Sequence, residues 1–471
     1  MCSDHEHNVP TASIIGQNHG EMTMTNLRAL FATTALVACG TAAVAEDINI
    51  TVWAGGSNDA DSYRWESIEM AADMLEREYA LQGEELNITV EAKRDFGGWD
   101  EFKQAVTLAA EAGTAPAIVV TSHLDIAPWS QAGYIVPVED YLDLDAWPLN
   151  DIYPNLMQIA AYDGVQWGLP QDAESRPFFF WKETMKGIGY SDADIDALPA
   201  KVASGEYTLQ NVLVDAKKAV DMGLVEEGYG FYPRVSNGPD FAQFYQSFGG
   251  TLQDPETGKL VLDKAAMEEM YQFFVDAVAA GVTRKNHIGT DWGQWYNEVA
   301  NGKAALWHGG TWHYARYTGK EGNPDFFGTI QFSLIPAGNA QGHANTITHP
   351  LVYLLTDQQD DMVEEVAAQL LKIASEPRMN SLHAIKSAHL GITKQQSNVE
   401  LYAGNRWADE ATERLLGTAN AQPNHLQYGV FAETMWKGLE AAWTGVQTPA
   451  EAVAAVEAEM TAKLGDELIV R

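Results

Sequence analysis

The amino-acid sequence predicts an α/β fold in which helices cover a parallel sheet. Two observations support this prediction. Beyond residue 45, short apolar segments alternate with longer segments that carry apolar residues every three or four positions. Strands and helices in this order are typical of parallel sheets. In addition, a length of 471 residues is sufficient for two or three domains.

Five elements open the predicted fold. The strands cover residues 48–53, 87–93 and 115–120. Two amphipathic helices lie between them, and each has one core-facing stripe with a spacing of three and four. The stripes are formed by Trp65, Ile68, Ala72, Leu75 and Tyr79 in the first helix and by Trp99, Phe102, Val106 and Ala109 in the second.

Polar residues follow the first and third strands. Asn58 and Asp59 come after the first strand, and His123 and Asp125 come after the third. Ligands bind such sheets beyond the carboxyl ends of the strands. We therefore expect these four residues to lie on adjoining loops and to contact a ligand.

The remaining chain continues to mix strands and helices, without repeats or low-complexity segments. The last helix begins with a capping box from Thr448 to Glu451. The other expected elements are a short strand ending at Pro170, an apolar strand at 178–181, helices at 207–222 and 263–281, a hairpin at 249–260, a strand at 328–336, a strand at 345–355 interrupted at His349-Pro350, and mostly helical chain from residue 360.

The segment 304–317, AALWHGGTWHYARY, has the features of a binding turn. A short strand breaks at Gly309-Gly310, and two glycines permit a sharp turn and close approach by another molecule. We expect Thr311 to cap the next helix and to leave free N–H donors, with Trp312 beside them as a flat apolar face. Donors next to an aromatic plane suit a sugar. The alternative is a packed strand-turn-helix with Trp312 in the core.

The N-terminal part, residues 1–45, is predicted to be a presequence. Residues 22–45 contain a basic residue, a short apolar run and an A-x-A site ending at Ala45, as in secretory signal peptides. The run is too short to span a bilayer. A lipoprotein-type site at Cys39 is the alternative, so lipid anchoring remains open beside soluble export.

Cysteine content and charge exclude several classes of function. Cys2 and Cys39 both lie in the presequence, so the mature chain has no disulfide framework, cysteine metal site or cysteine nucleophile. The formal charge of −36 is spread along the chain. This charge argues against nucleic acid or an anionic membrane surface as a partner.

Four segments, in this order, resemble elements of the family 1 extracellular solute-binding proteins of bacterial ABC importers, the group that includes maltose-binding protein. They are residues 103–135 with a helix, strand and A-x-x-G motif, residues 162–182 with DGVQWGLP, residues 301–312 with NGKAALWHGGTW, and residues 447–452 at the start of the last helix.

The resemblance implies a two-lobe periplasmic-binding-protein fold of type II, with a mostly parallel sheet in each lobe and a ligand cleft between the lobes. The first lobe would comprise residues 46–170, completed by 309–346. The second lobe would comprise residues 171–308, completed by 347–471.

The resemblance also implies a function. The protein would be a periplasmic binding component that captures a sugar, oligosaccharide or glycoside by hinge closure and delivers it to an ABC permease. It would act as a monomer, without catalysis or cofactor. The rival from another class is a secreted glycoside hydrolase, which needs paired carboxylates. A second rival is a lipid-anchored receptor or chemosensory binding protein.

Residue roles follow from the same resemblance. Trp312 would stack on the sugar, next to Gly310 and Thr311, and Asp172 or Glu174 would accept hydrogen bonds from its hydroxyls. Basic residues also gather near the proposed crossovers. One hypothesis is a donor-rich cleft for a sugar with an acidic substituent, and the alternative is pairing with acids inside the fold. No metal site is expected. The basic residues are Arg176, His308, His313, Arg316 and His349.

Overall fold

The computed structural model describes residues 46–56, 63–94 and 96–471. The predicted presequence and the predicted contact residues Asn58 and Asp59 lie outside the described residues. Within the described ranges, every helix is too short or too polar to cross a bilayer.

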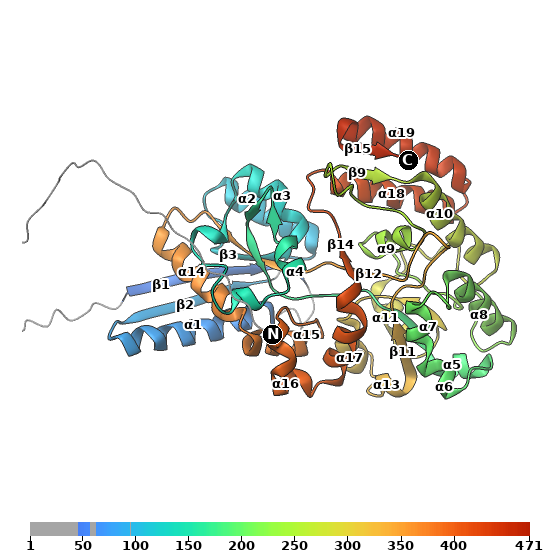
Figure 1. The fold of residues 1–471 in the computed structure, drawn as a ribbon, viewed down its shortest axis with the longest axis horizontal. Coiled ribbons are helices and arrows are strands. Elements are labelled where there is room, and N and C mark those ends of the chain that lie inside the picture. Colours follow the sequence, from blue (N-terminus) through green and yellow to red (C-terminus); the bar gives the residue numbers. More distant parts are fainter. Residues whose placement is uncertain (1–45, 57–62, 95) are drawn as a thin grey trace, which may run out of the picture. The chain divides into compact units, whose positions relative to one another are not determined.

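The first sheet contains the three strands predicted at the start of the mature chain (Figure 1). Its strands are β1 (Glu46–Ala54), β2 (Leu86–Lys93), β3 (Ile118–Ser122), β4 (Ile135–Val136), β7 (Gly168–Pro170) and β13 (Leu351–Thr356). Their order is β2-β1-β3-β13-β4, and β7 also pairs with β13. β1 is parallel to β2 and β3, as predicted, whereas β13 is antiparallel to its neighbours.

Alternate residues of β3 enter two different hydrophobic cores. Ile118 and Val120 lie in a core with Ile68 of helix α1 (Tyr63–Gln82). Val119 lies in a second core with Phe102 of α2 (Trp99–Glu111). Successive strand side chains point to opposite faces, so α1 and α2 cover opposite faces of this sheet. The predicted helix stripes are confirmed, except that Trp99 is 37% exposed.

The second sheet consists of three strands in the order β10-β8-β11. Its elements are β8 (Phe178–Trp181), β10 (Leu306–His308) and β11 (Ile330–Ser333), with α12 (His313–Thr318) and α13 (Phe326–Thr329) between the last two strands. Both outer strands are antiparallel to β8, whereas a mostly parallel sheet was expected in each lobe. The reason is that the connection through α12 and α13 crosses over β8, so β10 and β11 run in the same direction on either side of it.

Two pairings correct the segments that were expected to complete the lobes. β11, from the segment 309–346, pairs with β8 and not with the first sheet. β13, from the segment 347–471, pairs with β3 and is followed by α14 (Asp361–Ala374) and α15 (Pro377–Ser387), which pack on α1. The predicted interruption at His349-Pro350 is confirmed, because β12 (Thr346–Thr348) ends there and pairs with β14 (Ala419–Ala421).

The remaining elements surround these sheets. Helices α10, α18 and α19 pack on one another, and Thr448 forms the predicted capping box at the start of α19. The bounds are α3 (Ile126–Ala132), α4 (Pro154–Ile159), β5 (Ala161–Tyr162), β6 (Val165–Gln166), α5 (Lys182–Gly187), α6 (Asp192–Asp196), α7 (Leu198–Ala203), α8 (Leu209–Asp221), α9 (Asp240–Ser247), β9 (Leu260–Leu262), α10 (Lys264–Ala279), α11 (Trp292–Ala300), α16 (Glu400–Ala403), α17 (Arg406–Leu415), α18 (Tyr428–Trp443), α19 (Pro449–Leu464) and β15 (Leu468–Val470).

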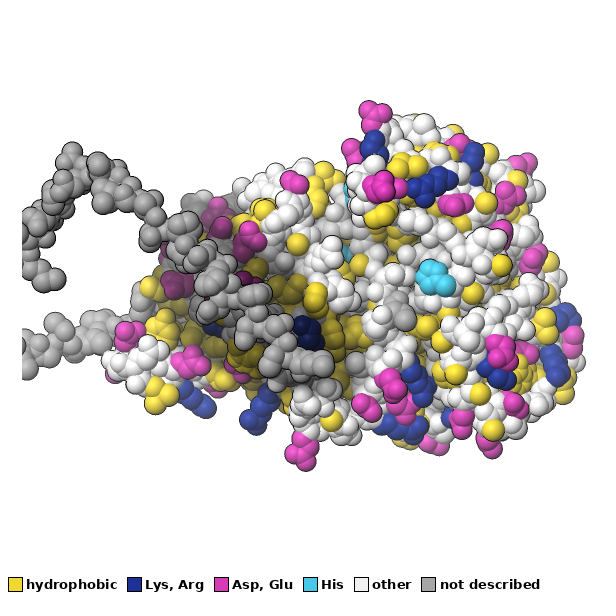
Figure 2. Space-filling view, viewed as in Figure 1, with side chains coloured by type: hydrophobic (Ala, Val, Ile, Leu, Met, Phe, Trp, Pro, Cys, Tyr) yellow, Lys and Arg dark blue, Asp and Glu magenta, His cyan; other side chains and the backbone are white. Residues whose placement is uncertain are grey.

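Charged side chains are interspersed on the face shown in Figure 2, where acidic and basic groups alternate among the described residues. This distribution gives no continuous basic surface on that face, and a basic surface is what a nucleic acid would need.

Candidate functional site

The segment 171–177 runs from the first sheet to the second and is held by main-chain hydrogen bonds. The N–H of Gln171 donates to the carbonyl of Leu351 at 2.8 Å. Ala173 and Leu390 exchange two N–H···O bonds of 2.9 and 2.6 Å. Chain segments that are far apart in the sequence therefore meet along this connection.

The Gly309-Gly310 turn also forms hydrogen bonds to this connection. The N–H groups of Gly309, Gly310 and Thr311 donate to Pro177 O (3.1 Å), His313 Nδ1 (3.3 Å) and Ser175 O (3.0 Å). Trp312 is the N-cap residue of α12. The prediction that Thr311 caps the helix and leaves free N–H donors is therefore wrong, because Trp312 is the N-cap residue and all three N–H groups already have acceptors.

The indole of Trp312 lies partly exposed among cationic and aromatic groups. The guanidinium carbons of Arg176 and Arg234 lie 4.8 and 5.7 Å from the ring centroid. The ring of His389 stacks on the indole with a centroid distance of 6.0 Å and an interplanar angle of 23°. The indole Nε1–H donates to the hydroxyl of Tyr296 at 3.3 Å. The alternative of a fully buried core tryptophan does not hold, since the side chain keeps a solvent-accessible part.

Glycine at position 310 is required by this placement. An added Cβ would lie 2.0 Å from ring atoms of Trp312, which is far inside van der Waals contact. The turn and the indole are therefore packed directly against each other.

Two arginines and two acids form a buried ion cluster beside the indole. Arg176 Nη2 lies 3.3 Å from Glu174 Oε1, and Arg234 Nε lies 3.2 Å from Asp240 Oδ2. His308 Nδ1 is 3.5 Å from Asp240 as well. Burial would raise the pKa of Asp240, but the two guanidinium groups outweigh it and hold this pKa well below its usual range.

Glu174 shows the opposite shift. Burial raises its pKa to about 8; the nearby Asp172 acts in the same direction, and Arg176 opposes it. At neutral pH the Glu174 carboxyl is therefore mostly protonated and can donate a hydrogen bond.

Asp172 is held by two histidines and the main chain. Its Oδ1 accepts from the N–H of Leu351 at 3.1 Å, and its Oδ2 lies 3.3 Å from His383 Nε2 and 3.9 Å from His389 Nδ1. Although burial would raise the pKa of Asp172, the histidines lower it. Among the described residues, these three side chains could share a metal ion, with ligand atoms within 4.8 Å of one another. His383 and the N–H of Leu351 are hydrogen-bonded to Asp172, whereas His389 Nδ1 at 3.9 Å lies beyond hydrogen-bond distance.

The predicted residues after the third strand form a second polar group. His123 is buried, its Nε2 lies 3.3 Å from Gln422 O, and its ring meets that of His349 edge-on at 4.8 Å. Burial lowers the pKa of His123 to about 4, so the ring is neutral at physiological pH. Asp125 is bound to Lys103 at 2.6 Å. The contacts of this group are therefore formed mainly with residues outside the crossover.

The structure brings most of the predicted contact residues into one region. Asp172, Glu174, Gly310, Thr311 and Trp312 meet at the crossover. His123, Asp125 and His349 form the second group, which is linked to the first through β13, where Leu351 bonds to Asp172.

The basic residues near the crossover mostly have acidic partners. Arg176 pairs with Glu174, His308 with Asp240, and Arg316 with Glu321 at 3.0 Å. The pairs of His308 and Arg316 agree with the alternative of internal pairing, whereas the carboxyl beside Arg176 is mostly protonated at neutral pH. His313 differs, because its Nε2 lies 3.1 Å from both Arg234 and the Tyr296 hydroxyl.

Sequence reasoning missed several residues of this region. They are Arg234, Asp240, Tyr296, His383 and His389, which come from three different stretches of the chain. No motif spacing connects them. The only signal is the turn-rich segment PRVSNGPD at 233–240, which indicates a loop that can carry site residues.

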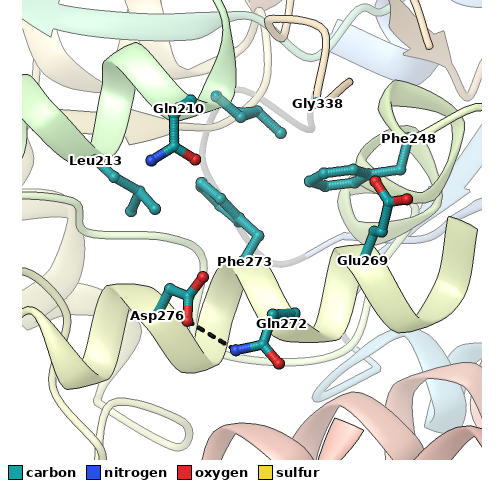
Figure 3. A pocket seen from close by; sticks show the side chains of 9 residues that line it. Gln210, Leu213, Phe248, Glu269, Gln272, Phe273, Asp276 and Gly338 are labelled. Carbon is teal, nitrogen blue, oxygen red and sulfur yellow. Dashed lines mark hydrogen bonds between the residues drawn. The ribbon is translucent and has the colours of Figure 1, made fainter. Parts of the chain in front are cut away.

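A pocket between α8 and α10 lies elsewhere on the molecule (Figure 3). It is lined by Leu213, Phe248 and Phe273, and Gln272 donates to Asp276 at its side. It contains none of the crossover residues and provides no cationic group.

Solved structures of other proteins share this fold. The chain superposes on the GacH receptor of Streptomyces glaucescens and on maltose-bound MalE3 of T. maritima, each with a TM-score of 0.70 and 18% identity. These matches cover 89% and 88% of this chain and 99% of either neighbour. An ABC transporter solute-binding protein of Thermotoga lettingae, bound to α-D-tagatose, superposes with a TM-score of 0.67, 19% identity and coverages of 88% and 98%. The fold is the two-lobe α/β fold of maltose-binding proteins.

The family follows from the sequence. Residues 71–372 match the model of the bacterial extracellular solute-binding proteins, and the chain belongs to this family. No curated protein sequence matches the chain.

Proposed function

We propose that this protein is the periplasmic substrate-binding component of an ABC importer for a sugar, oligosaccharide or glycoside. The observation that carries the proposal is the partly exposed Trp312 at the crossover, surrounded by Arg176, Arg234 and the acids of the ion cluster. An aromatic face bordered by charged donors and acceptors suits a ring with many hydroxyl groups. Family membership and neighbours that bind maltose or tagatose support it.

The proposed mechanism is closure of two lobes around the ligand. The strand pairings favour a first lobe of residues 46–170 completed by β13, α14 and α15, and a second lobe that contains β8, β10 and β11. Arg176 and Glu174 are buried in this structure. Ligand binding therefore requires the lobes to open, and closure then encloses the ligand.

A thermal-shift screen of the full chain against a sugar library tests this proposal. A ligand that binds only the folded state adds about 2.7 kcal/mol of stability at 100 times its Kd. We expect at least one sugar to raise the Tm. A rise with amino acids or peptides only, and with no sugar, would contradict the proposal.

Export and assembly complete the proposal. The chain would be exported by the signal peptide, act as a monomer and dock on the transmembrane subunits of its permease, without catalysis or cofactor. Mass spectrometry of the mature protein distinguishes cleavage after Ala45 from lipidation at Cys39. Size-exclusion chromatography with light scattering measures the oligomeric state.

A glycoside hydrolase is the rival candidate. Such enzymes use a pair of carboxyl groups, and Asp172 and Glu174 lie two positions apart in the chain. Incubation with aryl glycosides and with the sugars found in the screen tests this candidate. Release of product would favour the hydrolase, and recovery of intact ligand would favour the binding protein.

A further inference from the structure

We propose that the ligand carries a carboxylate substituent and that Arg176 is the residue that receives it. The inference rests on the proposed sugar-binding function and names the chemical class of the sugar, a uronic acid or a glycoside that contains one. Four observations at the crossover support it.

The guanidinium of Arg176 is buried but only partly hydrogen-bonded. The residue is 4% exposed, and among the described residues only Nη2 donates a hydrogen bond, to Glu174. Nε and Nη1 are buried without an acceptor within hydrogen-bond distance. A buried charged donor without an acceptor is costly, so the site is built for an acceptor that arrives with the ligand.

The unused donors lie next to the surface on which a sugar ring would rest. The guanidinium carbon of Arg176 is 4.8 Å from the centroid of the Trp312 indole. Arg234 approaches the same indole, but its charge is already matched by Asp240 at 3.2 Å. The carboxylate of a ligand stacked on Trp312 would therefore meet Arg176 rather than Arg234.

Ser175, which precedes Arg176 in the chain, and Thr311, which bonds to Ser175, carry buried hydroxyl groups that also lack partners among the described residues. Ser175 Oγ and Thr311 Oγ1 make no hydrogen bond there, and the two residues are 0% exposed. The main chains of these residues are joined by the 3.0 Å bond from Thr311 N–H to Ser175 O. Hydroxyl donors together with a guanidinium are a common way to bind a carboxylate.

The net charge of the groups around Arg176 also favours a negatively charged ligand. Burial raises the pKa of Glu174 to about 8, so at neutral pH this carboxyl is mostly uncharged. The nearest charged acid to Arg176 is then Asp240, 4.0 Å away and shared with Arg234. The ion cluster around Arg176 and Arg234 therefore carries a net positive charge, although the formal charge of the whole chain is −36. A neutral sugar would leave this charge uncompensated, whereas a carboxylate would match it.

Isothermal titration of the full chain with matched pairs of sugars tests the inference. The probes are D-glucuronate with D-glucose, D-galacturonate with D-galactose, and cellobiouronate with cellobiose, at pH 7. We expect the acidic member of at least one pair to bind at least about tenfold more tightly than the neutral member. Equal or tighter binding of the neutral member in every pair that binds would overturn the inference and leave the proposed function intact. Absence of binding by both members of all pairs would overturn the inference, and a positive sugar library screen would then keep the proposed function.

Substitutions assign the effect to Arg176. R176Q is expected to weaken binding of the acidic sugar at least about tenfold and to change binding of its neutral partner much less. R406Q is the control, because it removes the same charge from a side chain that is 62% exposed. Circular dichroism and the Tm establish that the variants are folded. If R176Q does not fold, R176K serves instead: it keeps the charge but loses the planar pair of donors, and should reduce the preference for the acid. A folded R176Q or R176K that keeps the full preference for the acid would overturn the assignment.

Discussion

Removal of the Trp312 indole tests the proposed ligand platform most directly. The substitution Trp312→Ala removes a ring that is partly exposed and that contacts Arg176, His389 and the hydroxyl of Tyr296. A sugar ring stacked on the indole removes apolar area from water at about 25 cal/mol per Å². For roughly 80 Å² on the two surfaces together, the expected loss of binding free energy is about 2 kcal/mol, or about 30-fold in Kd.

The same substitution also affects folding. The cation–π contact with Arg176 contributes about 0.5–2 kcal/mol, depending on how well it is desolvated. A decrease of about 2 kcal/mol in the free energy of unfolding is therefore expected without ligand. Since both effects lower the Tm, affinity must be measured separately, by titration calorimetry at a temperature well below the Tm of the variant.

Two control variants separate stacking from other effects. Trp312→Phe keeps a smaller aromatic face and removes the Nε1–H that donates to Tyr296, so it should lose less affinity than the alanine variant. Trp147→Ala removes an indole that is 47% exposed and remote from the crossover in the sequence, and it should bind as the wild type does. A folded Trp312→Ala protein with unchanged Kd would refute the role of this ring as the ligand platform.

Further predictions concern the turn and the ion cluster. Gly310→Ala should weaken ligand binding about tenfold or more, because the added Cβ must displace Trp312. Gly417→Ala is the control, because the Cβ added there meets no atom within 4 Å. Equal Kd values for the two variants would contradict the reasoning. Glu174→Gln should raise the free energy of unfolding more at pH 8 than at pH 5. The pKa of Glu174 is raised in the folded protein, so the wild type loses stability as pH rises from about 4.5 to 8. Urea denaturation of both proteins at the two pH values measures the difference. Asp240→Asn should lower the free energy of unfolding, measured in urea, by about 3–5 kcal/mol, because it leaves two guanidinium groups without their anion. The pKa of Asp240 is lowered in the folded protein, so the stability that this carboxylate contributes is present above about pH 4 and is lost in more acidic solution. A loss below 1 kcal/mol would contradict the role of Asp240.

Local sequence patterns predicted the first three strands and the two helices between them, because each of these elements is specified by neighbours in the sequence. The stripe on α1 follows from spacing and the strand predicted at 115–120 from its apolar run; that strand is observed as β3, two to three residues later, and the side chains enter hydrophobic cores. The interruption at Pro350 was visible for the same reason, since proline lacks the N–H that a strand needs.

Long-range pairing could not be predicted in this way. The strands β11 (IQFS) and β13 (LVYLLT) differ in length and composition, but neither sequence indicates which sheet the strand joins. The pairing of β11 with β8 depends on the crossover through α12 and α13, which is a property of chain path. The N-cap prediction at Thr311 failed for a related reason, because its N–H is used by Ser175, 136 positions earlier in the sequence.

The candidate site was visible only where one segment carries several members. Asp172 and Glu174 share a segment, as do Gly310 and Trp312, and these were predicted. Arg234 and Asp240 reach the indole from a turn-rich loop and α9, without a motif. Site residues that converge from distant segments leave no periodic signal, because what they share is a position in space.

Two charged groups buried in the chain differ in how fully they are hydrogen-bonded. Glu298 accepts hydrogen bonds from Tyr229, Tyr232, Gln294 and Lys303. At Arg176, two of three guanidinium nitrogens have no acceptor among the described residues. Other buried polar atoms lack a partner there as well, among them Arg284 Nε, so open donors alone do not mark a site. The position of the Arg176 donors beside Trp312 is what indicates where a partner outside the chain would bind.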